Sequence, residues 1–172
     1  MAEYLEQEIT DVVNVHVPNE NADIWNLKEV YEVMVTMFPL RDDQKLDSEA
    51  VRRLKAPEGM EEVTSAKKLA AYLVGLANQS YEEVEKKVVA TVGDDKVFRH
   101  IEKQMLLRST DTLWINHLDT MDSLRTSIGL RSYGQRDPLV EYKREAFRLF
   151  NQLLAEIRKQ VVYAIFKVRA EL

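Results

Sequence analysis

The stretch LRTSIGLRSYGQRDPLVEYKRE, residues 124–145, lies between the two longest helical patterns of the chain and decides the fold. It contains two glycines, which accept the positive φ that tight connections often need. Its Asp137-Pro138 pair is typical of a helix start, because the aspartate oxygen caps free amide groups and proline is preset for the first helical position. We therefore predict that this stretch is the tip of a helical hairpin whose second helix begins at Pro138.

Apolar residues on both sides of the tip recur at steps of three, four or seven, which places them on one face of a helix. The first helix of the hairpin is predicted from about Lys96 to Arg125. The faces that the two helices turn toward each other, here called the seam, comprise Leu106, Leu113, His117, Met121 and Leu124 before the tip, and Ala146, Phe150, Leu153, Ile157, Val161, Ala164 and Val168 after it. At ~1.5 Å per residue, each arm reaches about 45 to 50 Å. The tip is expected to lie well away from the bulk of the protein.

The composition favours an all-α protein. The chain has 172 residues, of which 45% are apolar, so it can form one large domain or two small ones with a real core. Only five glycines and four prolines are present, and no segment shows a convincing strand pattern. The predicted fold class is a small helical subdomain followed by a long antiparallel two-helix hairpin.

Shorter helical patterns fill the first half of the chain. The first ends at Pro18; the second has Asp23 as its expected N-cap and ends at Pro39. Residues 40–62 are polar, with at most one short helix over 48–54. A third helix is predicted over 65–78 and a fourth from Ser80, because Ser80 and Glu83 have capping-box spacing, before a break at Gly93.

The sequence lacks the motifs of several kinds of active site. Cysteine is absent, which excludes disulfides and thiolate zinc sites, and neither GxxxxGK[ST] nor GxGxxG occurs. No cofactor or metal is therefore expected. His117 lies near Asp119 and Asp122, but a single imidazole makes a poor transition-metal site, so we interpret it as a packed, hydrogen-bonded seam residue. Methionine and aromatic side chains at helical spacing are expected in the core, namely Trp25, Met34, Met37, Phe147 and Phe150.

Charge is distributed unevenly. The formal net charge is -5, which argues against general nucleic-acid binding, yet residues 125–144 carry five basic groups against Asp137 and Glu141. Such a loop is either simply solvated or a contact for acidic protein loops or anionic lipid heads, worth ~1 kcal/mol per basic group. No apolar run approaches the ~20 residues of a membrane span and no signal peptide opens the chain, so a soluble, cytoplasmic protein is expected.

Over residues 107–150 the chain resembles the SecA preprotein translocase motor family. The matching motifs are Leu113-Trp114, His117-Leu118-Asp119, Met121-Asp122, Leu124-Arg125, Gly129-Leu130-Arg131, the run YGQRDP at 133–138 and the run EYKRE at 141–145. Ser109, Thr110 and Asn116 depart from the family pattern. Upstream the resemblance is weaker, but it extends over the whole chain.

The resemblance implies a three-part organisation. Residues 1–18 would be the end of a long scaffold helix, residues 19–93 the helical wing domain, and residues 94–172 the two-helix finger of the helical scaffold domain. Both nucleotide-binding folds and the preprotein cross-linking domain of the family are missing. We therefore expect a C-terminal fragment that is not an enzyme by itself, whereas the parent uses ATP and magnesium.

The resemblance also implies the functional residues. The tip, formed by Ile128, Leu130, Arg131, Tyr133, Gln135 and Arg136, would contact unfolded preprotein and the SecYEG channel. The regulatory part of the seam would restrain ATP turnover by the parent's nucleotide-binding domains; it comprises Leu113, His117, Met121, Leu124, Phe150, Leu153 and Ile157. The parent would lie peripherally on the cytoplasmic face of the inner membrane. Anionic lipids and self-association through an exposed scaffold seam are further expected contacts.

Two other functions are compatible with the residues alone. A stand-alone helical adaptor would use the hairpin to bind a partner helix, and a weaker alternative is an RNA-binding basic loop. The flanking genomic sequence distinguishes the adaptor from the motor fragment, because only the fragment predicts an upstream phosphate loop in the same open reading frame.

Overall fold

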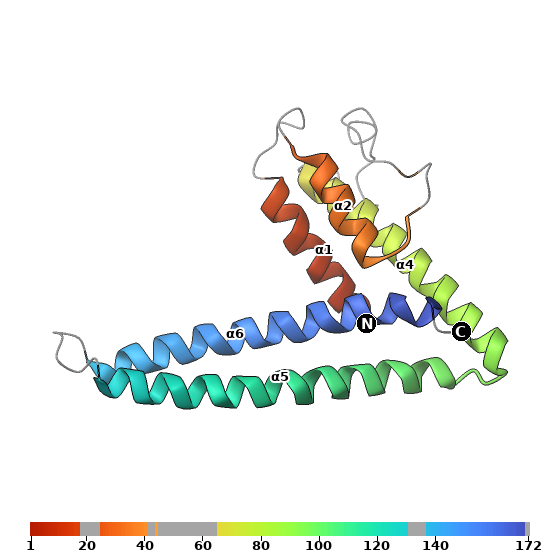
Figure 1. Ribbon diagram of the computed structural model, residues 1–172. Coiled ribbons are helices and arrows are strands. Elements are labelled where there is room, and N and C mark those ends of the chain that lie inside the picture. Colours follow the sequence, from red (N-terminus) through yellow and green to blue (C-terminus); the bar gives the residue numbers. More distant parts are fainter. Residues whose placement is uncertain (18–24, 41–43, 45–64, 131–136, 171–172) are drawn as a thin grey trace. The chain divides into compact units, whose positions relative to one another are not determined.

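The chain is all-α, as predicted. The computed structural model describes residues 1–17, 25–40, 44, 65–130 and 137–170, and every helix or strand assigned within them is helical. The helices are α1 (Ala2–His16), α2 (Leu27–Met37), α4 (Ser65–Val92), α5 (Val97–Leu130) and α6 (Pro138–Ile165), followed by the 3-10 helix η3 (Phe166–Ala170) (Figure 1). The chain divides into two compact units: residues 1–100 with 162–172, and residues 101–161. The expected short helix over 48–54 lies outside the described residues.

The first unit has the apolar core. α1 contacts both α2 and α4, and α4 also contacts η3. The fully buried side chains of this unit come from all of its elements and include Leu5, Ile9, Val13, Val30, Met34, Leu69, Leu73, Val88, Phe98 and Ile165. Phe38 and Phe166 add a ring contact with centroids 5.8 Å apart. The predicted burial of Trp25, Met34 and Met37 is confirmed.

α4 is one continuous helix, so the predicted helix start at Ser80 is wrong. Buried residues continue through that position at steps of three and four, in the order Leu69, Leu73, Ala77, Ser80, Val84 and Val88. Ser80 is only 8% exposed, so it is part of the packed stripe rather than a helix cap. A capping-box spacing does not interrupt a helix whose buried face continues across it.

Asn26, rather than the predicted Asp23, caps α2. Its Oδ1 accepts a hydrogen bond from the backbone N–H of Glu29 at 3.2 Å, and its Nδ2 donates to Glu29 Oε2 at 2.5 Å. Glu29 also lies 3.5 Å from His16 at the end of α1. Asp23 itself lies outside the described residues.

The predicted break at Gly93 is confirmed. Gly93 has φ 76°, the left-handed conformation that favours glycine, and its N–H donates to the Val89 carbonyl at 2.8 Å. Asp94 Oδ1 then accepts from the backbone N–H of Lys96 at 2.9 Å, just before α5 begins. Arg99 donates to both Tyr81 Oη, at 2.7 Å, and Glu85 Oε1, at 2.9 Å, and so ties the first turn of α5 to α4.

Alanine substitutions at two glycines should have opposite effects on stability. A Cβ at either Gly75 or Gly93 meets no atom within 4 Å, so backbone conformation alone decides the outcome. Gly75→Ala inside α4 should raise the free energy of unfolding by about 0.5–1 kcal/mol, whereas Gly93→Ala should lower it by about 1 kcal/mol. Urea denaturation of both variants is the measurement. Equal shifts of the same sign would contradict the left-handed turn at Gly93.

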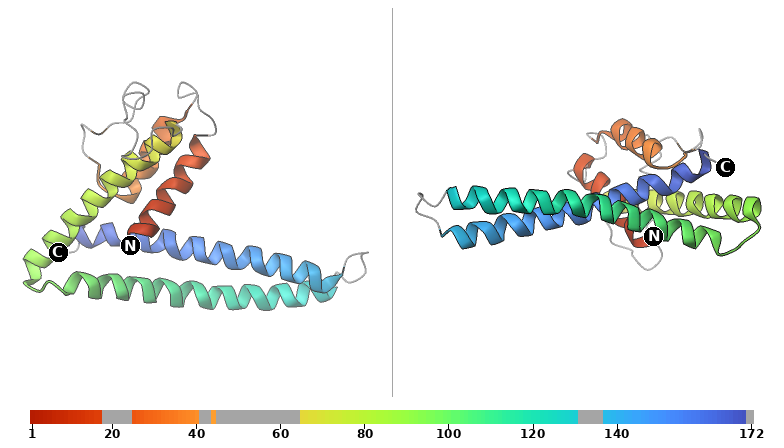
Figure 2. Two further views of the ribbon diagram at one scale, coloured as in Figure 1. Left: turned by 180° about the vertical axis from the view of Figure 1, so that it is seen from behind. Right: turned by 60° about the horizontal axis from the view of Figure 1, so that its bottom comes forward.

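The second unit is a pair of long antiparallel helices. It contains most of α5 and α6, which lie side by side in all three views (Figures 1 and 2). Within residues 101–161 only Ser109, Leu153, Ile157 and Val161 are buried. Two helices alone therefore leave most of their apolar side chains partly exposed. The assignment of residues 1–18, 19–93 and 94–172 to named parts of the family stays a prediction.

Candidate functional site: the two-helix hairpin

α6 begins where the sequence predicts. The Asp137 side chain accepts a hydrogen bond from the Leu139 N–H at 2.9 Å, and its carbonyl accepts from the Glu141 N–H at 3.2 Å. Pro138 occupies the first helical position, where its missing N–H costs no hydrogen bond. The Asp-Pro pair is confirmed as the helix start.

α5 continues five residues beyond its predicted end at Arg125, to Leu130. Polar side chains in these last turns bond inside the helix, since Thr126 Oγ1 donates to the Asp122 carbonyl at 3.1 Å and Ser127 Oγ donates to the Leu124 carbonyl at 3.0 Å. Gly129 is therefore helical rather than part of the connection. Six residues, 131–136, join the two helices.

The predicted tip is described only at its beginning. Ile128 is half-buried in the last turn of α5, and Leu130 is the final helical residue. Arg131, Tyr133, Gln135 and Arg136 lie outside the described residues. Their predicted role stays a prediction.

The seam is half-open. On α5, Leu113, His117, Met121 and Leu124 are each half-buried, whereas Leu153 and Ile157 on α6 are buried. Phe150 is 42% exposed and Phe147 is 70% exposed, so the prediction that these two rings belong to the core is wrong. The reason is geometric: a two-helix hairpin has only one inner face, and both rings lie beyond its edge.

His117 is a packing residue at the edge of the seam. Its ring centroid lies 5.7 Å from that of Trp114 on the same helix and 6.2 Å from that of Phe150 on α6. Among the described residues, no three His, Asp or Glu side chains are grouped in a way that could hold a metal ion. The packed environment predicted for His117 is confirmed.

One face of the hairpin is polar. A shallow hollow of about 140 Å³ lies there between the helices. Its lining includes Asn116 and Thr120 from α5 and Gln152 and Glu156 from α6, and Gln152 Nε2 donates to Glu156 Oε1 at 2.9 Å. The hollow carries no group suited to nucleophilic or acid-base chemistry beyond Glu156 and the packed His117.

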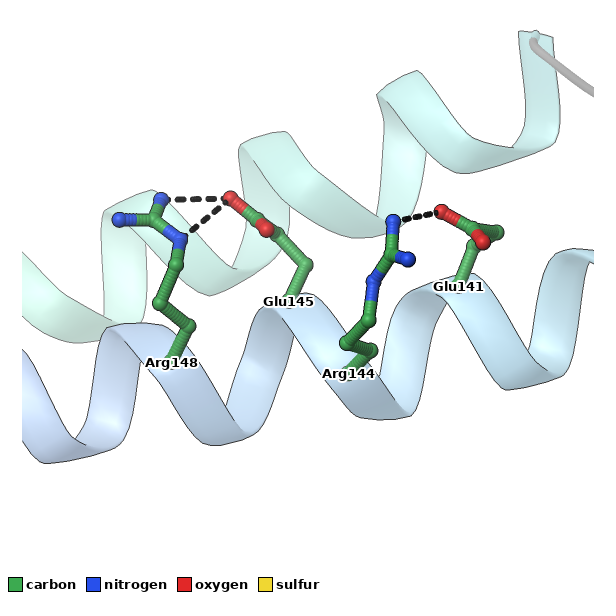
Figure 3. A network of polar contacts seen from close by, with 4 residues as sticks. All are labelled: Glu141, Arg144, Glu145 and Arg148. Carbon is green, nitrogen blue, oxygen red and sulfur yellow. Dashed lines mark hydrogen bonds and ion pairs between the residues drawn. The ribbon is translucent and has the colours of Figure 1, made fainter.

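Ion pairs run along the start of α6 (Figure 3). Arg144 Nη2 lies 2.5 Å from Glu141 Oε2, and Arg148 Nη2 lies 2.5 Å from Glu145 Oε1. The hydrogen bond from Glu145, together with its negative charge, raises the pKa of the Arg148 guanidinium above its ordinary value. Exposed pairs at this spacing contribute little to stability, so they mainly hold the arginine side chains in place.

Comparison with known proteins identifies the family. A family model described as the SecA wing and scaffold domain matches residues 1–169, nearly the whole chain. The chain belongs to this family. The protein translocase subunit SecA of Gloeobacter violaceus is 38% identical over 165 residues, and that of Symbiobacterium thermophilum is 42% identical over 125 residues. The subunit named SecA 1 of Mycolicibacterium smegmatis is 32% identical over 177 residues.

The wing and scaffold chain is much shorter than these relatives. The three matches include 95%, 73% and 99% of this chain but only 16%, 12% and 18% of the respective relatives. Within the described part of the chain, no helix is long and apolar enough to cross a membrane.

Sequence reasoning missed the exposed apolar residues of the hairpin. Trp114 and Leu118 on α5, and Phe147 and Leu154 on α6, are 44–70% exposed. Their signal is present in the sequence, because each follows a seam residue by one position. The same residues were read as core or passed over, because spacing alone does not reveal how many helices surround a seam.

Proposed function

We propose that this chain is a non-catalytic mechanical and regulatory part of a protein-translocating motor. Its membership of the SecA wing and scaffold family carries the proposal, and the long hairpin supports it. A hairpin of two long helices extends a short connecting loop about 35 to 50 Å along its axis, which suits contact with a substrate away from the body of a motor.

The tip is the proposed contact for the translocating polypeptide and for the SecYEG channel. Tyr133 lies in the loop of six residues between α5 and α6, with Arg131 and Arg136 close in sequence. An aromatic ring presses its apolar face on any peptide without requiring a particular sequence. Such a contact suits a motor that moves many different clients.

The hairpin helices are the proposed contact for the motor's nucleotide-binding domains. A rigid helical surface against which those domains close gives two discrete arrangements, and coupling between sites requires such a two-state contact. Buried Leu153 and Ile157 maintain the spacing of the two helices, so they are the residues on which this regulation depends most.

ATP and magnesium are assigned to the parent protein and not to this chain. The 172 residues contain no GxxxxGK[ST] loop, whose backbone amides and lysine bind phosphates. We expect calorimetric titration of the isolated chain with ATP and magnesium to give no saturable heat. Saturable binding with a micromolar dissociation constant would contradict this prediction.

The proposed location is the cytoplasmic face of the inner membrane, with the parent bound peripherally. The basic groups between Arg125 and Arg144 provide a contact for anionic lipid heads as well as for acidic loops of the channel.

A further inference from the structure

One face of the hairpin displays apolar side chains that the seam does not use. Trp114 is 44% exposed, Leu118 51%, Phe147 70% and Leu154 49%, and Leu107 is also exposed. Each follows a seam residue by one position, which turns it about 100° around its helix from the seam. These five residues, together with the edge residue Phe150, are here called the apolar face.

The members from α5 and α6 lie on the same side of the hairpin. In an antiparallel pair of right-handed helices, a turn in the same sense from the shared seam leads to the same face on both. The ring contacts agree, because Trp114 on α5 and Phe150 on α6 both pack against His117. The opposite side carries the polar hollow lined by Asn116 and Gln152.

The size of this face suits a stable interface. The overlapping part of the two helices is about 35 Å long and about 20 Å wide, which gives about 700 Å². A standard interface buries about 800 Å² per partner. Exposed patches of this kind on soluble proteins mark interaction sites.

We propose that the apolar face binds the same face of a second copy of this chain, forming a four-helix bundle with two-fold symmetry. Two hairpins stacked in this way supply each other with the missing layer, since helical bundles bury their seams among four helices rather than two. The inference is independent of the proposed motor function.

Charge selects one orientation of the two copies. Residues 111–122 of α5 contain Asp111, Asp119 and Asp122 and no basic group, whereas residues 143–158 of α6 contain four basic and two acidic groups. A two-fold axis along the hairpin places α5 of each copy over α6 of the other, so opposite charges meet. An axis across the hairpin places α5 over α5 and is disfavoured by like charge.

The register of the hairpin supports this orientation. Counting turns outward from the His117–Phe150 contact puts Asp119 level with Arg148 and Asp122 within one turn of Arg144. In the favoured bundle Asp119 therefore faces Arg148 of the other copy. Arg148 keeps its bond to Glu145 and adds a second carboxylate at the interface.

The first test is the mass of the 172-residue chain in solution, by light scattering and sedimentation equilibrium. A dimer is expected. Phe147→Glu should raise its dissociation constant at least about 30-fold without changing helix content, because this ring is 70% exposed within one copy. Asn116→Glu, an added charge on the polar face, should leave the dimer intact. A monomeric chain, or equal loss of dimer in both variants, would overturn the proposal.

The second test determines the orientation. The chain has no cysteine, so single cysteines are introduced by Asp119→Cys in one sample and Arg148→Cys in another. Oxidation of the mixed samples should link position 119 of one copy to position 148 of the other. Preferential linkage of position 119 to position 119 would contradict the proposed axis.

Discussion

Replacing Tyr133 with alanine in the parent motor is expected to remove most protein translocation, by about tenfold or more, while leaving the fold intact. Tyr133 lies in the loop of six residues between α5 and α6, outside the part of the chain that the structure describes. Loop side chains away from a core contribute little to stability, whereas an aromatic ring at a contact contributes much of its binding energy. Transport of a model preprotein into membrane vesicles is the measurement.

Two controls separate loss of contact from damage to the hairpin. Tyr133→Phe keeps the ring and should retain most transport, and Asn151→Ala, at an exposed position in the middle of α6, should behave like the unaltered motor. Thermal unfolding of all three variants should be unchanged within about 0.5 kcal/mol. Normal transport by Tyr133→Ala, or a large loss of stability, would contradict the assignment of this residue to the tip contact.

The second large effect concerns ATP turnover. Added in trans to a motor fragment that lacks it, the wing and scaffold chain should lower the resting ATPase rate. Leu153→Ala and Ile157→Ala should relieve this inhibition, because each removes a buried side chain between the hairpin helices at a cost of about 2 to 5 kcal/mol. The steady-state ATPase rate, titrated with each variant, is the measurement.

The variants that should not relieve inhibition are equally informative. Tyr133→Ala should inhibit as the unaltered chain does, because the loop does not maintain the helix spacing. Phe150→Ala should have a smaller effect than Leu153→Ala, since Phe150 is 42% exposed and Leu153 is 5% exposed. Equal relief by tip and seam variants would show that the division between regulatory seam and contacting tip is wrong.

Local signals predicted the limits of the hairpin well. The Asp137-Pro138 pair marked the start of α6, and Gly93 marked the turn before α5, because each satisfies a specific backbone requirement at a helix end. The all-α fold followed from composition and periodicity alone. Asn26 was missed as the cap of α2, since several residues before that helix have side chains able to cap it.

Periodicity was a poor guide to burial. It correctly identified the face of α6 that contains Leu153 and Ile157, yet it also assigned Phe147 to a core. Ser80 shows the opposite error, because a polar residue with capping-box spacing lies in the buried stripe of a continuous helix. Both outcomes depend on which other helices are present, and a single helical pattern does not contain that information.

The central claim is that the hairpin tip touches the polypeptide that the motor moves. A photoreactive amino acid at position 133 of the parent motor, activated while a preprotein is stalled during translocation, tests this claim directly. The account predicts cross-links from position 133 to the preprotein and none from position 151 in the middle of α6. Equal cross-linking from both positions, or none from position 133, would contradict it.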